Sequence, residues 1–292
     1  MTGTKKILAL AVCLSLGVGQ AAWSQPADPP SEGEQILRKS EQAYHDLNSY
    51  VGTSAVVSVT DFGDSKQTST AIASIEFVRP GKIRIYGGDE DGGGFTIISD
   101  GQKTWNSWQL IQGGAFQEAQ STKLAIAGMT GVAHNAPTLI PAALGVADIS
   151  WAFSTKQRKG AALQGHERIG GEDCLKVQAE QSKSTWTFWV SSRDFLLRQA
   201  REEQDTEQLA EVQRTMREYR KLHPDPTFDE QLKTMTADER QKIEAMTPER
   251  RERLRQSIDH PRDHTMLWST DLYIFSIDSV NKSVPDNRFQ KP

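Results

Sequence analysis

The stretch that decides the fold is FVRPGKIRIYGGDEDGGGFTIISDGQKTWNSW, residues 77–108. Apolar and polar residues alternate along KIRIY and FTIIS, which is the pattern of strands with one buried face. Arg79-Pro80-Gly81 predicts a corner, because proline fixes its φ angle and lacks an amide donor while glycine adopts many conformations. Asp100-Gly101 predicts a tight hairpin between FTIIS and QKTWNSW. Short strands with such close turns indicate an antiparallel meander.

Further strands are predicted on both sides of this stretch. Before it, Tyr50–Thr60 and Thr68–Val78 are rich in β-branched residues and are joined by the turn DFGD. After it come two hairpins and a last strand: Gly165–Glu180 with its turn at Gly170-Gly171, Ser184–Glu203 with its turn near Ser191–Asp194, and Ser269–Val280. The sequence therefore predicts a largely antiparallel sheet.

Helical patterns flank the strands. Ser31 and Glu34 have the spacing of a capping box, in which each side chain satisfies a free backbone amide of the first turn. The apolar residues that follow share one face at helical spacing: Ile36, Leu37, Ala43, Tyr44 and Leu47. This helix is expected to lie on the sheet. The apolar, small-residue-rich segment Glu118–Ser150 is typical of short helices or of a flap.

A charged segment, Arg201–His264, separates the last two predicted strands and contains 13 Lys and Arg and 16 Asp and Glu. Its first part carries a narrow apolar stripe that predicts an amphipathic helix: Leu209, Val212, Met216 and Tyr219. Two more helix starts are predicted from capping patterns: Thr236 with Glu239, and Thr247 with Pro248. The segment is interpreted as a helical insertion whose charges form a solvated face or, alternatively, an arm that docks a protein partner.

The beginning of the chain predicts export. Lys5 and Lys6 precede Ile7–Val18, which is apolar but too short for a stable membrane anchor. Small residues suit cleavage after Ala21 or Ser24. We expect a signal peptide over 1–24, a disordered tether over 25–30, and one domain over 31–292 located in the periplasm. A lipoprotein signal ending at Cys13 is the alternative.

Composition excludes several partners. The net charge is −4 and no basic stripe is present, which argues against nucleic acid and against electrostatic attachment to anionic lipid. Contact with a membrane is expected to be transient at most. Only Cys174 remains after cleavage of the signal, so no internal disulfide is expected and the thiol is interpreted as a small buried apolar group.

Groups for catalysis or metal binding are few. No GxSxG motif and no cysteine–histidine signature occur. His260 and His264 have a spacing that could bind zinc on a helix, but Pro261 lies between them. The loop GGDEDGGG lacks the ligand spacing of an EF-hand and is expected to be a solvated hairpin tip. We expect no cofactor, no metal and no enzymatic activity; an unrecognised hydrolase is the remaining enzymatic alternative.

The Arg79-Pro80 corner followed by a hairpin and SDGQKTW, residues 99–105, resembles the LolA superfamily of outer-membrane lipoprotein-sorting proteins. In that family a strand ending in Arg-Pro is followed by Ser-Asp-Gly-Lys-Thr-hydrophobe-Trp. Here Gln102 is added after the glycine, and the residue between threonine and tryptophan is missing. The ending SVPDNRFQKP is also similar. The resemblance is close over 31–108, loose over 165–200, and finds no counterpart for the charged insertion.

The resemblance implies an α+β fold: a strongly curved antiparallel sheet, an unclosed β-barrel, with an N-terminal helix, lid helices over an apolar cavity and the charged helical insertion. It implies a carrier or binder of lipid or lipoprotein acyl chains without bond chemistry. The alternative is an envelope sensor or scaffold that binds a protein partner through the insertion.

The resemblance also implies candidate residues. By position, Arg79 would influence cargo release, although a surface arginine at a strand end is the alternative. Leu124–Val146 is the expected lid. The other residues expected to bind or release cargo are Phe77, Ile83, Ile85, Trp105 and Trp108.

Overall fold

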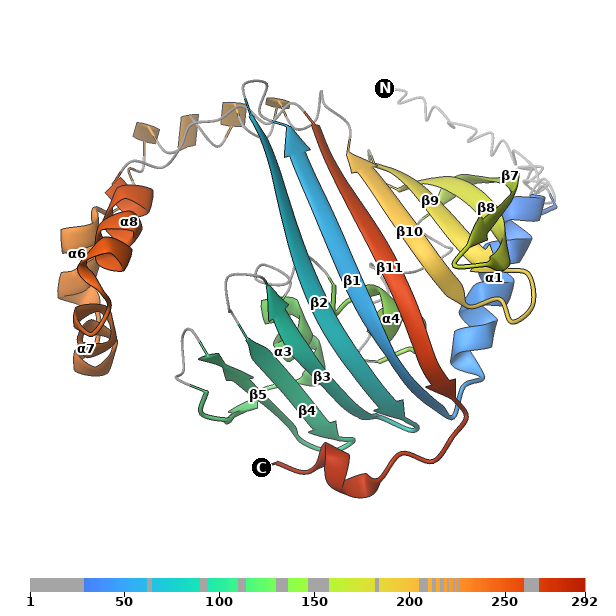
Figure 1. Ribbon diagram of the computed structural model, residues 1–292, viewed down its shortest axis with the longest axis horizontal. Coiled ribbons are helices and arrows are strands. Elements are labelled where there is room, and N and C mark those ends of the chain that lie inside the picture. Colours follow the sequence, from blue (N-terminus) through green and yellow to red (C-terminus); the bar gives the residue numbers. More distant parts are fainter. Residues whose placement is uncertain are drawn as a thin grey trace, which may run out of the picture. The chain divides into compact units, whose positions relative to one another are not determined.

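The strands form a single antiparallel sheet in the computed structural model (Figure 1). The structure describes residues 29–61, 65–89, 94–109, 114–129, 136–146, 158–181, 184–204, 226–259 and 268–291, with scattered residues of 210–224. The strands are β1 Ser49–Asp61, β2 Lys66–Val78, β3 Lys82–Asp89, β4 Phe95–Asp100, β5 Thr104–Trp108, β6 Gln117–Ala119, β7 Lys159–Ile169, β8 Glu172–Gln181, β9 Ser184–Ser191, β10 Leu197–Gln204 and β11 Trp268–Val280.

Two meanders make up this sheet. The strand order is β6-β5-β4-β3-β2-β1-β11-β10-β9-β8-β7, so each half runs through consecutive hairpins and the halves meet where β1 pairs with β11. β6 and β7 lie at opposite edges of the order, so the sheet is not closed. The predicted α+β fold with an unclosed, curved antiparallel sheet is confirmed.

The hairpins have the geometry that their sequences predict. Gly101 has a φ of 95°, and the Asp100 carboxylate accepts hydrogen bonds from the Gln102 and Lys103 amides at 2.8 Å each. Gly170 and Gly171 both have positive φ and join β7 to β8. Left-handed backbone at these positions favours glycine, because a Cβ atom would clash with the backbone.

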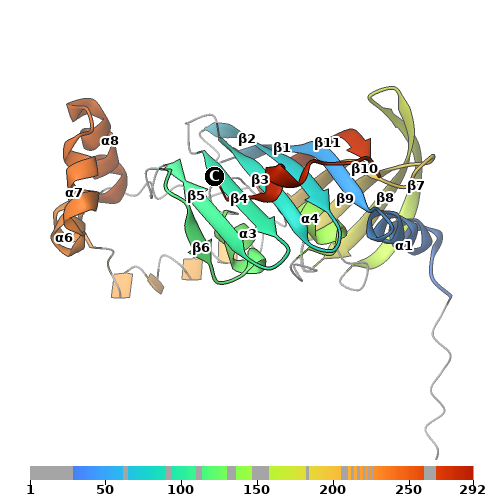
Figure 2. The same cartoon turned by 90° about the horizontal axis from the view of Figure 1, so that it is seen from below.

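Three helices lie within the curve of the sheet (Figure 2): α1 Glu32–His45, α3 Thr122–Met129 and α4 Leu139–Ala143. We call this side of the sheet the concave face and the opposite side the convex face. Buried side chains from the helices and from the sheet form one apolar cluster. Because an apolar sheet face must be covered, these helices complete the core.

The N-terminal helix is fixed to the sheet edge at its first turn. The Ser31 hydroxyl accepts a hydrogen bond from the Glu34 amide at 3.2 Å, as predicted, and donates one to the Ala161 carbonyl of β7. A Cβ atom on Gly33 would lie 2.6 Å from the Ala161 backbone, so only glycine permits this approach. The helix packs along β7, β8 and β9.

The convex face carries both covered and exposed apolar residues. The C-terminal 3₁₀ turn η2, Asp286–Phe289, packs on β3 and β4, where Phe289 is buried and Arg288 pairs with Glu76. Farther along the sheet, Ile72 is 48% exposed and Ile274 is 43% exposed, and both pair with Ala55 of β1. We call these three residues the convex strip. Among the described residues no helix is both long and apolar enough to cross a membrane.

The charged insertion forms helices with contacts of their own: α6 Phe228–Thr234, α7 Ala237–Glu244 and α8 Pro248–Asp259. Phe228 is buried, its amide donates to the Asp259 carboxylate at 2.7 Å, and the Arg255 guanidinium lies 5.0 Å from its ring centroid. α7 and α8 begin where predicted, and the Thr247 hydroxyl accepts from the Arg250 amide. The capping box found at Thr227 and Glu230 was not predicted. Much of the predicted stripe at Leu209, Val212 and Met216 lies outside the described residues.

We expect this insertion to be separable from the sheet. β10 runs to Gln204 and β11 begins at Trp268, so residues 205–267 are the segment to replace by a short Gly/Ser linker. Loop length changes stability slowly, so the cooperative thermal transition should survive with a shift of about 5 °C or less while far-UV dichroism loses helical signal. Loss of the cooperative transition would show instead that α6–α8 complete the core.

An ionic network fixes the turn between β9 and β10. The Arg198 guanidinium donates to Glu172 at 2.6 Å and to Asp194 at 2.7 Å, and its side chain is 12% exposed. The Arg198 hydrogen bond, with a smaller contribution from Ser191, lowers the pKa of the Glu172 carboxyl. A carboxyl with a lowered folded-state pKa stabilises the fold above its unfolded pKa, and this stabilisation is lost as the pH falls.

Arg198→Met should therefore change the pH dependence of stability. We expect it to lower the free energy of unfolding at pH 7 by about 1–3 kcal/mol. Between about pH 5 and pH 2 the stability of the variant should fall less steeply with pH than that of the wild type. Urea unfolding at several pH values measures both effects. Arg168→Met, which removes an exposed guanidinium, is the control; equal acid slopes in the wild type and in Arg198→Met would contradict this role of the network.

Candidate functional site

The candidate site is the part of the concave face that α4 covers. Phe77 of β2 pairs with Ile83 of β3, and Ile75 pairs with Ile85 in the next row of the same face. All four side chains are buried and belong to the central cluster. The sequence-predicted residues Phe77, Ile83 and Ile85 therefore lie together on the covered face.

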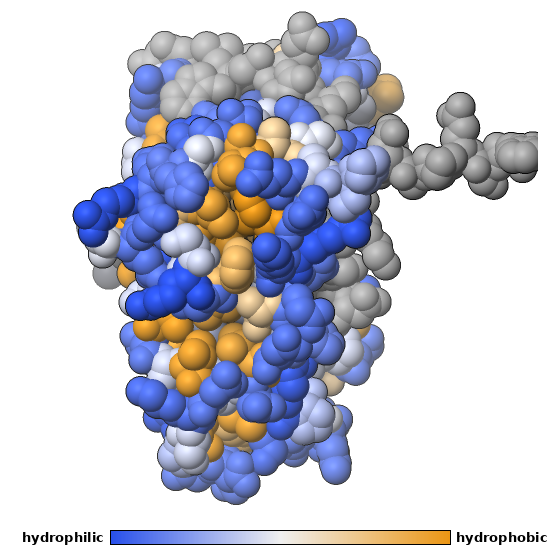
Figure 3. Space-filling model, turned by 90° about the vertical axis from the view of Figure 1, so that its right-hand side faces the viewer, coloured by the Kyte–Doolittle hydropathy of each residue, from blue (hydrophilic) through white to orange (hydrophobic). Residues whose placement is uncertain are grey.

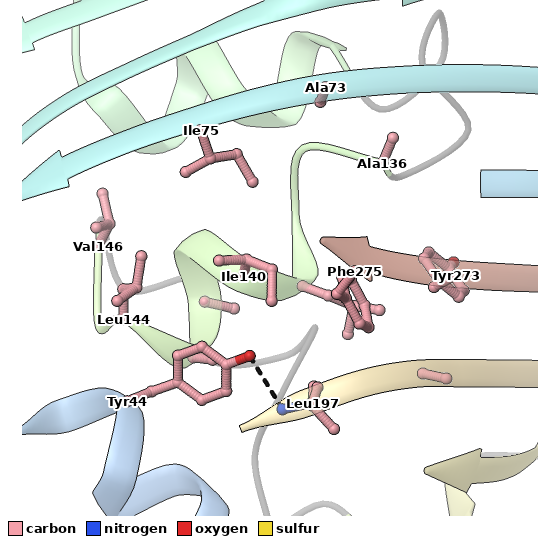
Figure 4. Close-up of a cluster of buried hydrophobic side chains, with 14 of the residues drawn as sticks. Tyr44, Ala73, Ile75, Ala136, Ile140, Leu144, Val146, Leu197, Tyr273 and Phe275 are labelled. Carbon is pink, nitrogen blue, oxygen red and sulfur yellow. Dashed lines mark hydrogen bonds between the residues drawn. The ribbon is translucent and has the colours of Figure 1, made fainter. Parts of the chain in front are cut away.

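The lid over these rows is short and built partly from small residues. Figure 4 shows Ile140, Leu144 and Val146 of α4 and its C-terminal turn close to Ile75 of the sheet, with Phe275 of β11 beside Ile140. The helix has five residues, LIPAA, and all five are buried. So short a helix has little stability of its own, and its position depends on side-chain packing and on what binds its ends.

Arg79 binds the ends of two helices at once. Its Nε donates to the Leu47 carbonyl at 2.7 Å, and its Nη2 donates to the carbonyls of Tyr44 and Leu144 at 3.2 and 3.3 Å. Tyr44 is in the last turn of α1, and Leu144 caps α4. Carbonyls at helix C-termini lack partners within the helix and favour a cation. Arg79 thus ties α4 to α1 and to the corner of the sheet, which is more than a surface arginine would do; we call these three hydrogen bonds the latch.

Tyr44 supports the latch from the other side. Its hydroxyl accepts a hydrogen bond from the Leu197 amide of β10 at 3.2 Å, as drawn in Figure 4. Burial raises the pKa of Tyr44 well above its ordinary value, so the hydroxyl stays neutral. Its ring also contacts that of Tyr50, with the centroids 6.3 Å apart. α1 is therefore fixed to the sheet close to the carbonyl that Arg79 binds.

The two candidate tryptophans lie on opposite faces. Trp108 pairs with buried Phe95, packs against the core cluster, and has its ring 3.3 Å from the position of a Cβ atom on Gly128 of α3. Trp105 pairs with Ile98, whose neighbour Ile97 belongs to the concave row, so Trp105 lies on the convex face. Of these two tryptophans, only Trp108 lies on the face below the helices and can report on it directly.

A hollow of about 390 Å³ opens beside the latch. Its walls come from the Pro80-Gly81 corner, the β4–β5 turn, the start of α3 and the loop after α4. Thr104 and Thr122 are joined there by a hydrogen bond of 2.6 Å between their hydroxyls. The hollow gives solvent access to the edge of the lid, where Gly145 and Val146 lie.

The sequence pointed to Arg79 as a candidate but not to the carbonyls that it binds. Carbonyls of Tyr44, Leu47 and Leu144 carry no side-chain signal, and they meet only in the folded chain. In the described part of the chain no group of three or more His, Cys, Asp or Glu side chains could hold a metal ion. His260 and His264 fall outside the described residues. Cys174 is buried and unpaired, as predicted.

A model of the family described as predicted periplasmic protein (DUF2092) matches residues 33–232. The chain belongs to this family. The expected location in the periplasm is confirmed by that description. No curated protein matches the chain in sequence.

Several solved structures are similar to the chain. They include the Mycobacterium tuberculosis lipoprotein LppX, at 11% identity and a TM-score of 0.41 over 87% of this chain and 97% of that one. A LolA superfamily protein from Nitrosomonas europaea has 13% identity and a TM-score of 0.32 over 89% and 97%. LprF from Mycobacterium bovis has 15% identity and a TM-score of 0.36 over 61% and 89%. The architecture predicted from the sequence, an unclosed antiparallel sheet with covering helices, is confirmed by the strand order and the helices of the structure.

Removing the latch should loosen α4 more than the sheet. In Arg79→Leu, the amides of Leu144 and Val146, which are bonded to the Ile140 and Pro141 carbonyls, should exchange with deuterium about tenfold faster or more. The loss of hydrogen bonds from a charged donor supplies this change. Hydrogen exchange with mass spectrometry or NMR measures it. Arg84→Leu, which removes a guanidinium from the opposite face, should leave these rates unchanged; equal rates in Arg79→Leu and the wild type would contradict the latch.

Proposed function

We propose that the protein binds acyl chains of lipids or lipoproteins between α4 and the concave face, and that Arg79 controls their entry and release. The observation that carries this proposal is the combination of buried apolar rows with a five-residue lid whose C-terminal end is held by one guanidinium. A core that needed only stability would gain more from a longer, self-supporting helix. A removable lid suits a protein that must hide an apolar surface when empty and offer it to cargo.

The free energies of the interactions favour replacement of the contacts of α4 with the sheet by contacts of an acyl chain with the sheet. Three half-buried hydrogen bonds from a guanidinium contribute on the order of 5–9 kcal/mol in total. Burying a chain of about fifteen CH₂ groups supplies roughly 12 kcal/mol before the cost of association. An acyl chain can therefore offset the opening of the latch, whereas a short apolar molecule cannot. We expect affinity to rise with chain length until the concave face is filled.

Location in the periplasm fits such a role, because acyl chains that cross an aqueous compartment need a protein to shield them. The proposal assigns no bond chemistry to the protein. LppX is called a lipoprotein, and the Nitrosomonas europaea protein is called a LolA superfamily protein.

A second candidate is a sensor or scaffold that binds an envelope protein through the insertion. It is favoured by the separate packing of α6 with α8 and by exposed Tyr219 and Leu222, which are 59% and 77% exposed. A partner captured by the full chain but not by the chain lacking residues 205–267 would favour this candidate. Equal capture by both would count against it.

Binding should be visible in tryptophan fluorescence. A fatty acid carrying a quencher near its chain end should quench the protein, and Trp108→Phe should remove a substantial part of that quenching because Trp108 lies on the covered face. Trp105→Phe is the matched control, since its ring lies on the other face. Native mass spectrometry of protein purified without detergent should also detect bound lipid. Absence of bound lipid together with absence of quenching would exclude the carrier.

A further inference from the structure

The concave face has a second region, whose polar and charged residues take no part in the latch or the lid. Beyond the rows under α4, one row crosses four strands through paired residues: Ser58 of β1, Asp271 of β11, Glu202 of β10 and Trp186 of β9. Paired residues share a face, and Trp186 belongs to the concave cluster, so this polar row lies on the concave side. Acids and hydroxyls are unusual on the covered face of a sheet.

A buried guanidinium lies over this row. Arg158, directly before β7, is 4% exposed, and its guanidinium carbon lies 4.3 Å from the ring centroid of Phe188 and 4.8 Å from that of Trp186. Trp186 is stacked on Phe188 and on Tyr273, with centroids 5.6 and 5.7 Å apart. Two aromatic rings, Trp186 and Phe188, thus form a floor under the cation, and Tyr273 extends this floor by stacking on Trp186.

The charges that act on the guanidinium are those of carboxylates. Burial lowers the pKa of Arg158 to about 9, while Glu202 and Glu41 of α1 act in the opposite direction. Burial, with the charge of Asp271 beside it, raises the pKa of Glu202. Removing such groups from water is costly, and buried charges are retained more readily where they serve a function.

An unsatisfied hydroxyl lies in the same row. The Ser58 side chain is 7% exposed, and its Oγ has no hydrogen-bond partner in the described structure. Buried hydroxyls normally find a partner, so Ser58 indicates a place in this row where a polar group of another molecule can bind.

We propose that Arg158, Glu202, Asp271 and Ser58 form a head-group subsite that takes the zwitterionic head of a single- or double-chain amphiphile. This inference rests on the proposed function, since the acyl chain would occupy the rows under α4. The anionic group, a phosphate or carboxylate, lies against Arg158, and the ammonium group lies against Glu202 and Asp271 over the aromatic floor. A purely anionic head would face three carboxylates, and a purely cationic head would face Arg158. A head with both charges can place an opposite charge against each set.

Three amphiphiles with one identical acyl chain test this subsite: lysophosphatidylethanolamine, lysophosphatidylglycerol and a monoacylglycerol. Titration calorimetry below their micelle concentrations, on the detergent-free full chain, should give the zwitterionic lipid a dissociation constant about tenfold lower than either of the others. Arg158→Met and Glu202→Gln should each reduce this preference to about twofold or less while leaving monoacylglycerol binding unchanged. Arg201→Met removes an arginine that contacts Trp189 from the other face of β10 and should keep the preference.

The outcomes distinguish failure of the head-group subsite from failure of the proposed carrier function. If the three amphiphiles bind the wild type equally, or if the preference persists in Glu202→Gln and Arg158→Met, the subsite is overturned and the carrier stands. If the anionic lipid binds as tightly as the zwitterionic one, the ammonium assignment is overturned. If none of them binds, the proposed function fails, and this inference fails with it. Glu202→Gln leaves the side-chain volume almost unchanged, so it tests the head-group subsite even if Arg158→Met does not fold.

Discussion

The pairing of β1 with β11 is the constraint on which the rest of the structure depends. It runs from Tyr50 opposite Val280 to Asp61 opposite Trp268, and it joins two meanders that each form from local hairpins. Only this pairing turns two half-sheets into one curved surface, with the helices inside the curve. The two strands are over two hundred residues apart in sequence. The entropy cost of closing this long loop is therefore paid in the folding step that pairs β1 with β11.

The concave face of the curved sheet must be covered by helices, and these helices are held in place to different degrees. α1 is a full helix fixed at both ends, by Ser31 at the β7 edge and by the Tyr44 hydroxyl on β10. α4 has only five residues and relies on the guanidinium of Arg79 at its C-terminus. The weakest part of the cover therefore lies over the most apolar rows of the sheet. That coincidence is what the proposed binding of acyl chains rests on.

Features that depend on residues close together in the chain could be predicted from the sequence. Strand alternation, the Asp100-Gly101 and Gly170-Gly171 turns and the Ser31 cap all act within a few residues, so they could be predicted. The partners of Arg79 are backbone carbonyls, and the row of Ser58, Asp271, Glu202 and Trp186 comes from four strands whose pairing is set by the β1–β11 closure. No pattern within one segment contains them. Trp105 and Trp108 are three residues apart in one strand, so alternation already places them on opposite faces, but only the folded sheet shows that Trp108 is the one facing the helices.

The central claim is that an acyl chain enters beneath α4 rather than binding to apolar residues on the outside. A fatty acid with a nitroxide near its chain end, added to protein with labelled isoleucine methyl groups, tests this most directly by paramagnetic broadening in NMR. The account predicts broadening of Ile75, Ile85 and Ile140, which lie under or in the lid. Broadening confined to Ile72 and Ile274 of the convex strip, with the lid residues unaffected, would contradict it.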